Sequence, residues 1–123
     1  TMEKIKKIRD AFEKSLINLD LGIVIIGKNS VRLPNTFLFS MPSIESQTLL
    51  MALDLEGFEV STGAACSSGQ IEPSKTLKSM GLSNNIINSS IRVSLGSYNT
   101  MEDVVRFNYA IKKISKRFMK VVL

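Results

Sequence analysis

The chain has 123 residues, 44% of them hydrophobic and 22% charged, which is enough apolar material for one core in a single domain. One cysteine and no histidine exclude an internal disulfide and effectively rule out a structural zinc site. The net charge of +5 comes mostly from residues 100–123, which hold six of the 16 Lys and Arg residues but two of the 11 acids. Cations near the end of a helix most often form a solvated face, so the charge alone does not indicate nucleic-acid binding.

The first half of the chain predicts a helix, two strands and a second helix. In residues 1–20, apolar side chains recur at steps of three and four between Lys and Glu, the pattern of an amphipathic helix. GIVIIG at 22–27 and TFLFSM at 36–41 are short runs rich in β-branched or aromatic residues, and we interpret both as strands. Ser43 can cap a helix, and apolar residues then repeat at helical spacing until Gly57 ends the run.

The second half continues with short elements around the cysteine. FEVST at 58–62 predicts a brief strand that leads into the cysteine-containing loop. Residues 73–80 begin with Pro-Ser and end before a glycine, which predicts a short helix. The polar stretch SNNIINSS at 83–90 predicts no regular element, whereas IRVSL at 91–95 alternates like a strand.

A long helix is expected at the end of the chain. Thr100 can cap it, Asp103 lies three residues further on as in a capping box, and apolar side chains continue at helical spacing to Phe118. The expected order is therefore α-β-β-α-β-loop-α-β-α. This pattern indicates an α+β fold of two layers, in which helices cover a small, mostly antiparallel sheet.

Cys66 lies in the run Gly-Ala-Ala-Cys-Ser-Ser-Gly at 63–69. A free cysteine is more often a small buried hydrophobic residue than a nucleophile. Here the neighbouring glycines and serines offer little to anchor the thiol in a core, which favours an accessible loop. A nucleophilic thiol needs a base, and the chain has no histidine to supply one. Activation would have to come from another chain or domain, a cofactor or a substrate.

Arg92 is the second residue of the IRVSL strand. In a strand, Ile91, Val93 and Leu95 share one face, and Arg92 and Ser94 share the other. The simpler interpretation is an arginine on a solvated sheet face. The alternative is a guanidinium that binds a carboxylate or phosphate through two parallel hydrogen bonds.

Three stretches resemble one known family. GFEVSTGAACSSGQIEPSKTLKSMGL at 57–82 and NSSIRVSLG at 88–96 closely resemble the C-terminal part of the cysteine desulfurases, pyridoxal-phosphate enzymes of the class V aminotransferase family. RLPNTFLFSMPSIESQTLLMALDLEG at 32–57 extends the resemblance, which covers roughly residues 5–118. The length between the cysteine and Glu-Pro-Ser is similar to the branch with a long cysteine loop, which includes iron–sulfur cluster and nitrogen-fixation enzymes.

The resemblance implies a role for both candidate residues. In that family the loop thiolate attacks the sulfur of substrate cysteine, which leaves a persulfide on the enzyme and releases alanine. Cys66 matches this nucleophile, and Arg92 matches the arginine that binds the substrate carboxylate. No residue of this chain matches the lysine, histidine or aspartate that hold pyridoxal phosphate, because these belong to the family's large domain. Residues 1–123 therefore correspond to the small C-terminal domain, without a cofactor of its own.

The resemblance also implies the partners. They are L-cysteine, a large pyridoxal-phosphate domain in the same or a separate chain, and a sulfur-acceptor or scaffold protein, and the complete enzyme would be a homodimer. No apolar run is long enough for a membrane span and no signal peptide is recognisable, so we expect a cytoplasmic protein that binds neither membrane nor nucleic acid.

Three other functions remain open from the sequence. The chain could be a degenerate, non-catalytic module that binds a partner or carries a persulfide. It could belong to a selenocysteine lyase or another class V transferase. A basic nucleic-acid binder would use Lys112, Lys113 and Lys116 and would show salt-sensitive binding, although no strand carries paired aromatic residues for stacking bases.

Overall fold

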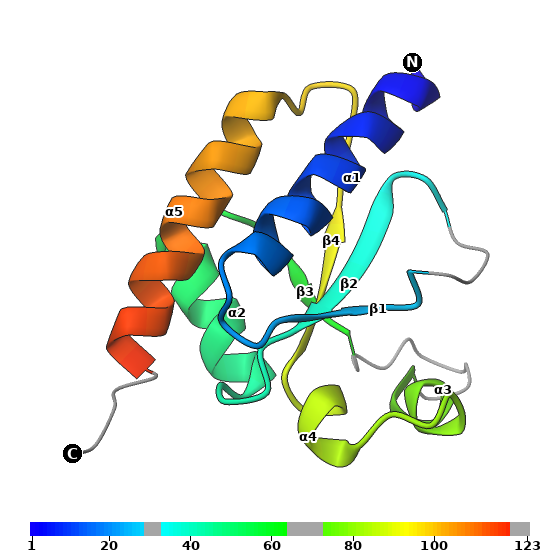
Figure 1. Ribbon diagram of the computed structural model, residues 1–123, viewed down its shortest axis with the longest axis vertical. Coiled ribbons are helices and arrows are strands. Elements are labelled where there is room, and N and C mark those ends of the chain that lie inside the picture. Colours follow the sequence, from blue (N-terminus) through cyan, green and yellow to red (C-terminus); the bar gives the residue numbers. More distant parts are fainter. Residues whose placement is uncertain (29–32, 64–72, 119–123) are drawn as a thin grey trace.

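The computed structural model describes residues 1–28, 33–63 and 73–118, and these contain a small sheet with helices on its two faces (Figure 1). The helices are α1 (Met2–Asn18), α2 (Ser46–Leu55), α3 (Pro73–Ser79), α4 (Asn84–Ile87) and α5 (Met101–Phe118). The strands are β1 (Val24–Ile26), β2 (Thr36–Ser40), β3 (Ser61–Thr62) and β4 (Ser90–Ser94). The α+β class predicted from the sequence is confirmed.

The four strands form one sheet in the order β1-β2-β4-β3, and every neighbouring pair is antiparallel. Strands β2 and β4 pair along their full lengths, from Thr36 opposite Ser94 to Ser40 opposite Ser90. At the edge, β3 pairs with β4 through only two residues. The mostly antiparallel sheet expected from the sequence is therefore present, and β4 lies in its interior.

One face of the sheet carries the main core. Phe37 and Phe39 of β2 and Ile91 and Val93 of β4 are buried on this face and pack with apolar residues of α1, α2 and α5. Phe107 of α5 is at the centre of this core. The ring of Phe107 makes edge-on contacts with three other phenylalanine rings at centroid distances of 5.1 to 6.0 Å, namely those of Phe12, Phe39 and Phe58. In Figure 1, α1 and α5 accordingly lie side by side across this layer.

The opposite face is covered at one end by α3 and α4. Ile26 of β1 is buried there with Leu77 of α3 and Ile87 of α4, and Leu38 of β2 packs against them. Neighbouring residues of β2 thus contribute to different clusters, as the alternation of side chains along a strand requires.

Helix α4 corrects one sequence expectation, because residues 83–90 were expected to form no regular element. The Ser83 hydroxyl accepts a hydrogen bond from the Ile86 N–H at 3.3 Å and caps the helix. Its carbonyl end is held by the sheet, since the hydroxyls of Ser40 and Ser90 donate to the Ile86 and Ile87 carbonyls, both at 2.8 Å. A four-residue helix is unstable by itself, so these two bonds, of which the one from Ser40 spans 46 residues, stabilise it.

Two expected boundaries are also wrong. Helix α2 begins at Ser46 rather than after a Ser43 cap, and its N-cap residue, Glu45, makes no side-chain capping bond. The Ser46 N–H instead donates to the Asn88 carbonyl at 2.7 Å, so a distant segment satisfies the helix end. The strand expected at 58–62 is reduced to its last two residues.

Of the two capping residues expected for α5, Asp103 acts as predicted. Its carboxylate accepts hydrogen bonds from the Thr100 N–H at 2.9 Å and from the Asn99 amide at 3.1 Å. These two donors, with a smaller contribution from Arg106, hold the pKa of the Asp103 carboxyl below its usual value.

No helix in the described part of the chain is long and apolar enough to cross a membrane.

We expect Asp103→Ala to lower the free energy of unfolding by about 1 kcal/mol at pH 7, because it removes the acceptor at the helix start. Folding depresses the pKa of Asp103. The stabilisation that this carboxylate gives is therefore fully present at a pH above its pKa in the unfolded chain, and is lost as the pH falls through its pKa in the folded protein. Urea denaturation at pH 7 and pH 3 should show the difference between the two proteins shrinking in acid. The matched control is Glu102→Ala, an exposed acid in the same turn. Equal losses in both variants at pH 7 would contradict the capping role.

Candidate functional site

Arg92 lies in the middle of β4 on the face of the sheet opposite the main core. Its neighbours Ile91 and Val93 are buried, whereas Arg92 is exposed. In the register, Arg92 is flanked by Leu38 on β2 and Ser61 on β3. Because directly opposed residues of an antiparallel pair share a face, these side chains lie beside the guanidinium. The alternation predicted from the sequence therefore places Arg92 correctly.

The guanidinium has one protein partner in the described part of the chain. The Arg92 Nε–H donates to the Ser61 hydroxyl at 3.1 Å, and this bond links strands that are 31 residues apart. No carboxylate among the described residues forms an ion pair with Arg92. The positive charge is thus exposed and has no counter-charge within residues 1–28, 33–63 and 73–118, and a carboxylate or phosphate group is the chemistry that it can bind.

Cys66 lies outside the described residues, so the structure does not test its placement. The second described stretch, residues 33–63, ends at Gly63, directly after β3. Cys66 follows three residues later in the sequence. The Gly63 N–H donates to the Ser90 carbonyl at 3.0 Å, which continues the pairing of β3 with β4 by one residue. The segment that contains Cys66 therefore starts at the same sheet edge as the Ser61–Arg92 pair.

Gly63 fits against the sheet only because it lacks a side chain. A Cβ atom at this position would lie 2.5 Å from the Ser90 Oγ, 2.9 Å from the Ser90 Cβ and 3.1 Å from the Leu38 Cδ2. Ser90 cannot move freely, since it is buried and its hydroxyl donates to the Ile87 carbonyl. The chain can pass this close to β4 only with glycine at position 63.

We expect Gly63→Ala to lower the free energy of unfolding by about 1–3 kcal/mol, the usual range for overpacking at a rigid site. Urea denaturation of the two proteins would measure the loss. Gly96→Ala is the matched control, because the three atoms nearest to its Cβ would all belong to the ring of Tyr98, which is 82% exposed and can move away. A loss at Gly63 no greater than at Gly96 would show that the contact with Ser90 can relax.

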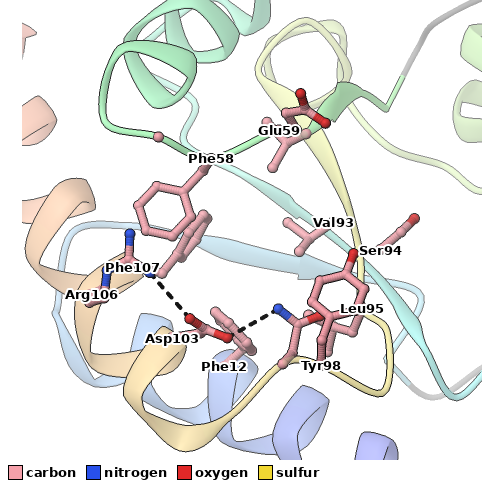
Figure 2. Close-up of a pocket in the computed structure, with 13 residues that line it drawn as sticks. Phe12, Phe58, Glu59, Val93, Ser94, Leu95, Tyr98, Asp103, Arg106 and Phe107 are labelled. Carbon is pink, nitrogen blue, oxygen red and sulfur yellow. Dashed lines mark hydrogen bonds and ion pairs between the residues drawn. The ribbon is translucent and has the colours of Figure 1, made fainter.

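A pocket of about 480 Å³ lies beyond Arg92, at the end of β4 (Figure 2). Val93, Ser94 and Leu95 contribute to its wall, and the other lining residues come mainly from residues 57–60 and the start of α5. The guanidinium of Arg106 lies over the Phe58 ring, 5.2 Å from its centroid.

Two of the three charged side chains that line this pocket, Arg106 and Asp103, are paired with each other, and the third is Glu59. Arg106 donates to the Asp103 carboxylate at 3.3 Å, and the same carboxylate also accepts from Asn99 and from the Thr100 N–H. Asp103 therefore acts as a helix cap with a lowered pKa, which is unsuited to a base near neutral pH. Because Arg106 is already paired with Asp103, we take the exposed guanidinium of Arg92 as the better candidate for binding a carboxylate.

Sequence reasoning did not identify Ser61 as part of this site. The only signal was its position in the short β-prone run before the cysteine segment. Its partner could not be inferred from that run, because the contact depends on the register between β3 and β4. The structure thus adds a hydroxyl to the arginine that the sequence had already singled out.

Comparison with known proteins identifies relatives over most of this chain. Residues 1–107 match the family "Aminotransferase class-V". The "Cysteine desulfurase IscS" of Dictyoglomus turgidum is 37% identical over 120 residues, which cover 98% of this chain and 30% of that protein. The protein of the same name from Clostridium botulinum (strain Hall) is 44% identical over 88 residues, covering 72% of this chain and 22% of that protein.

Two solved structures are also similar to this chain over most of its length. A structure described as a NifS-like protein aligns with a TM-score of 0.78 and 33% identity over 94% of this chain and 28% of its own. The NifS-like protein of Rickettsia africae aligns with a TM-score of 0.76 and 34% identity over 94% of this chain and 29% of its own. This chain therefore spans less than a third of the length of these proteins.

Proposed function

Because the chain belongs to the class V aminotransferase family, we propose that it is the small domain of a cysteine desulfurase. In this proposal, Cys66 takes the sulfur of L-cysteine as a persulfide, and Arg92 binds the carboxylate of the same substrate. The names of the relatives from D. turgidum and C. botulinum support this reaction. The remaining part of the enzyme, which supplies the pyridoxal-phosphate site, would correspond to the portion of these relatives that this chain does not cover.

The observation that carries the proposal is the environment of Arg92. Its guanidinium is exposed, is held by Ser61 and has no carboxylate partner among the described residues. Arginine can bind a carboxylate through two parallel hydrogen bonds, which fixes the orientation of the substrate as well as attracting it. A small amino acid bound in this way would present its side chain in one direction, and this restriction favours reaction at a single atom.

The position of Cys66 along the chain supports the second half of the proposal. Ser61 is directly opposite Arg92 in the sheet, and Cys66 follows Gly63 by three residues. Three residues of chain span at most about 11 Å, which is the farthest that Cys66 can lie along the chain from Gly63, and Gly63 directly follows the edge strand that pairs with β4. This length of chain is short enough for Cys66 to meet a substrate that Arg92 holds.

The proposed transfer is balanced within the two reactants. The Cys66 sulfur, as thiolate, forms a bond with the sulfur of L-cysteine, the carbon–sulfur bond of the substrate breaks, and the carbon takes up a proton to give alanine. The products are alanine and a persulfide on Cys66, and no external oxidant is needed. Pyridoxal phosphate, when bound to the complete enzyme, would supply the electron sink that makes this carbon–sulfur bond breakable. The residues around Arg92 fit the substrate carboxylate, while the base that activates Cys66 must come from outside a chain without histidine.

The proposal can be tested with a chimeric enzyme, in which this chain replaces the matching segment of the D. turgidum relative. We expect incubation with L-cysteine and pyridoxal phosphate to add the mass of one sulfur atom to Cys66 and to release alanine. The isolated chain, treated in the same way, should remain unmodified. A chimeric enzyme that binds the cofactor but gains no sulfur would instead support a degenerate, non-catalytic module.

If the proposal holds, the persulfide would be passed to a sulfur-acceptor or scaffold protein for iron–sulfur cluster or thio-cofactor synthesis. The long segment between β3 and α3 would suit such a delivery, because the same sulfur has to be received at one place and released at another. We also propose that the complete enzyme is a cytoplasmic homodimer. Size-exclusion chromatography of the chimeric enzyme with light scattering would test its dimeric state.

A further inference from the structure

Ser61 and Arg92 form an arrangement that the proposed function does not yet explain. The two residues are direct partners across the β3–β4 pair, and the Arg92 Nε–H donates to the Ser61 hydroxyl at 3.1 Å. We infer that Ser61 is a positioning residue, whose hydroxyl fixes the plane of the Arg92 guanidinium so that its two terminal nitrogens face the substrate carboxylate. This inference rests on the proposed function of Arg92.

The geometry of a guanidinium supports this role. Arginine can bind a carboxylate either through Nε and one terminal nitrogen or through both terminal nitrogens. At Arg92 the Nε–H is already occupied by Ser61. The side-on arrangement is therefore blocked, and the end-on arrangement through both terminal nitrogens remains.

The same bond reduces the cost of binding. A free arginine side chain has many rotamers, and holding it in one of them on binding costs free energy. Strand β4 fixes the backbone of Arg92 between two neighbouring strands, and Ser61 fixes the far end of its side chain. The guanidinium is thus oriented before the substrate arrives.

A purely structural role for this hydroxyl is poorly supported. The bond is exposed to solvent and Ser61 is only partly buried, so removing the hydroxyl would leave no buried donor unsatisfied. Strand β3 is also held by its backbone pairing with β4, which a change of side chain does not remove. Loss of the Ser61 hydroxyl should therefore affect Arg92 far more than the fold.

The decisive test is the steady-state kinetics of the chimeric enzyme with Ser61→Ala and Ser61→Thr. We expect Ser61→Ala to raise KM for L-cysteine about 3- to 10-fold, as expected for the loss of one solvent-exposed hydrogen bond of ordinary strength, with little change in kcat. Ser61→Thr keeps the hydroxyl and suits a strand, so it should restore a KM close to that of the unaltered enzyme. Thr62→Val is the matched control, because it removes a hydroxyl from the same strand at the position opposite Ile91.

A second measurement detects the hydrogen bond between Arg92 and Ser61 without depending on catalysis. In the isolated chain labelled with ¹⁵N-arginine, NMR should show the Arg92 Nε–H exchanging with water several-fold faster after Ser61→Ala, but not after Thr62→Val. Unchanged exchange in Ser61→Ala, or an unchanged KM in an active enzyme, would overturn the positioning role alone. A chimeric enzyme with the unaltered chain that binds cofactor but forms no alanine would overturn the proposed function itself, together with the inference that rests on it.

Discussion

Cys66→Ala should abolish sulfur transfer by the chimeric enzyme while leaving the fold intact. The thiolate is the only group of this chain proposed to form a bond with the substrate sulfur, so its removal should slow alanine formation at least about 10³-fold, as is usual for a lost nucleophile. Because Arg92 is unchanged, the variant should still bind L-cysteine. Alanine release and the intact mass of the chain would both measure the loss of sulfur transfer.

The stability of the same variant separates the two interpretations of the cysteine. Its neighbours at 63–69 are small or polar, which favours an accessible thiol, and Cys66→Ala should then change the free energy of unfolding by no more than about 0.5 kcal/mol. Cys66→Ser, of similar size, is the matched control and should also be inactive. If Cys66→Ala unfolded the chain, a buried structural cysteine would be favoured. If it kept normal turnover, another group would have to be the nucleophile.

Much of the fold could be predicted from local patterns. The alternation in IRVSL placed Arg92 opposite the buried face of β4, and the residues around Thr100 and Asp103 indicated the start of α5. In both cases the signal and the interaction lie within a few residues of each other. Local sequence was therefore sufficient to assign Arg92 to its face of the strand and to locate the start of the long helix.

The features that were missed depend on contacts between distant segments. Helix α4 is held by Ser40, which lies 46 residues from the carbonyl that it binds. Helix α2 begins where the Asn88 carbonyl accepts from its first N–H, and no property of Ser43 reveals this. The pairing of Ser61 with Arg92 likewise depends on the register of two strands. These contacts can be known only once the fold has brought the segments together.

Arg92→Ala should lower kcat/KM for L-cysteine by about 10²- to 10³-fold, because two hydrogen bonds to a charged carboxylate are lost together. Arg92→Lys keeps the charge but cannot form the two parallel bonds, so it should recover only part of this loss. The matched control is Arg106→Ala, which removes an exposed arginine paired with Asp103 rather than with the substrate. Steady-state kinetics of the three variants in the chimeric enzyme would measure these effects.

A substrate without a carboxylate shows whether Arg92 acts in the proposed way. Cysteamine has the thiol and the amine of cysteine but lacks the carboxylate, so the unaltered enzyme should strongly prefer L-cysteine. In Arg92→Ala this preference should shrink by about the same 10²- to 10³-fold, because only the reaction of L-cysteine depends on the guanidinium. Equal losses with both substrates would instead mean that Arg92 supports the fold or another part of the reaction. Since Arg92 is exposed and its one partner among the described residues is a serine hydroxyl, we expect the loss to fall on L-cysteine alone.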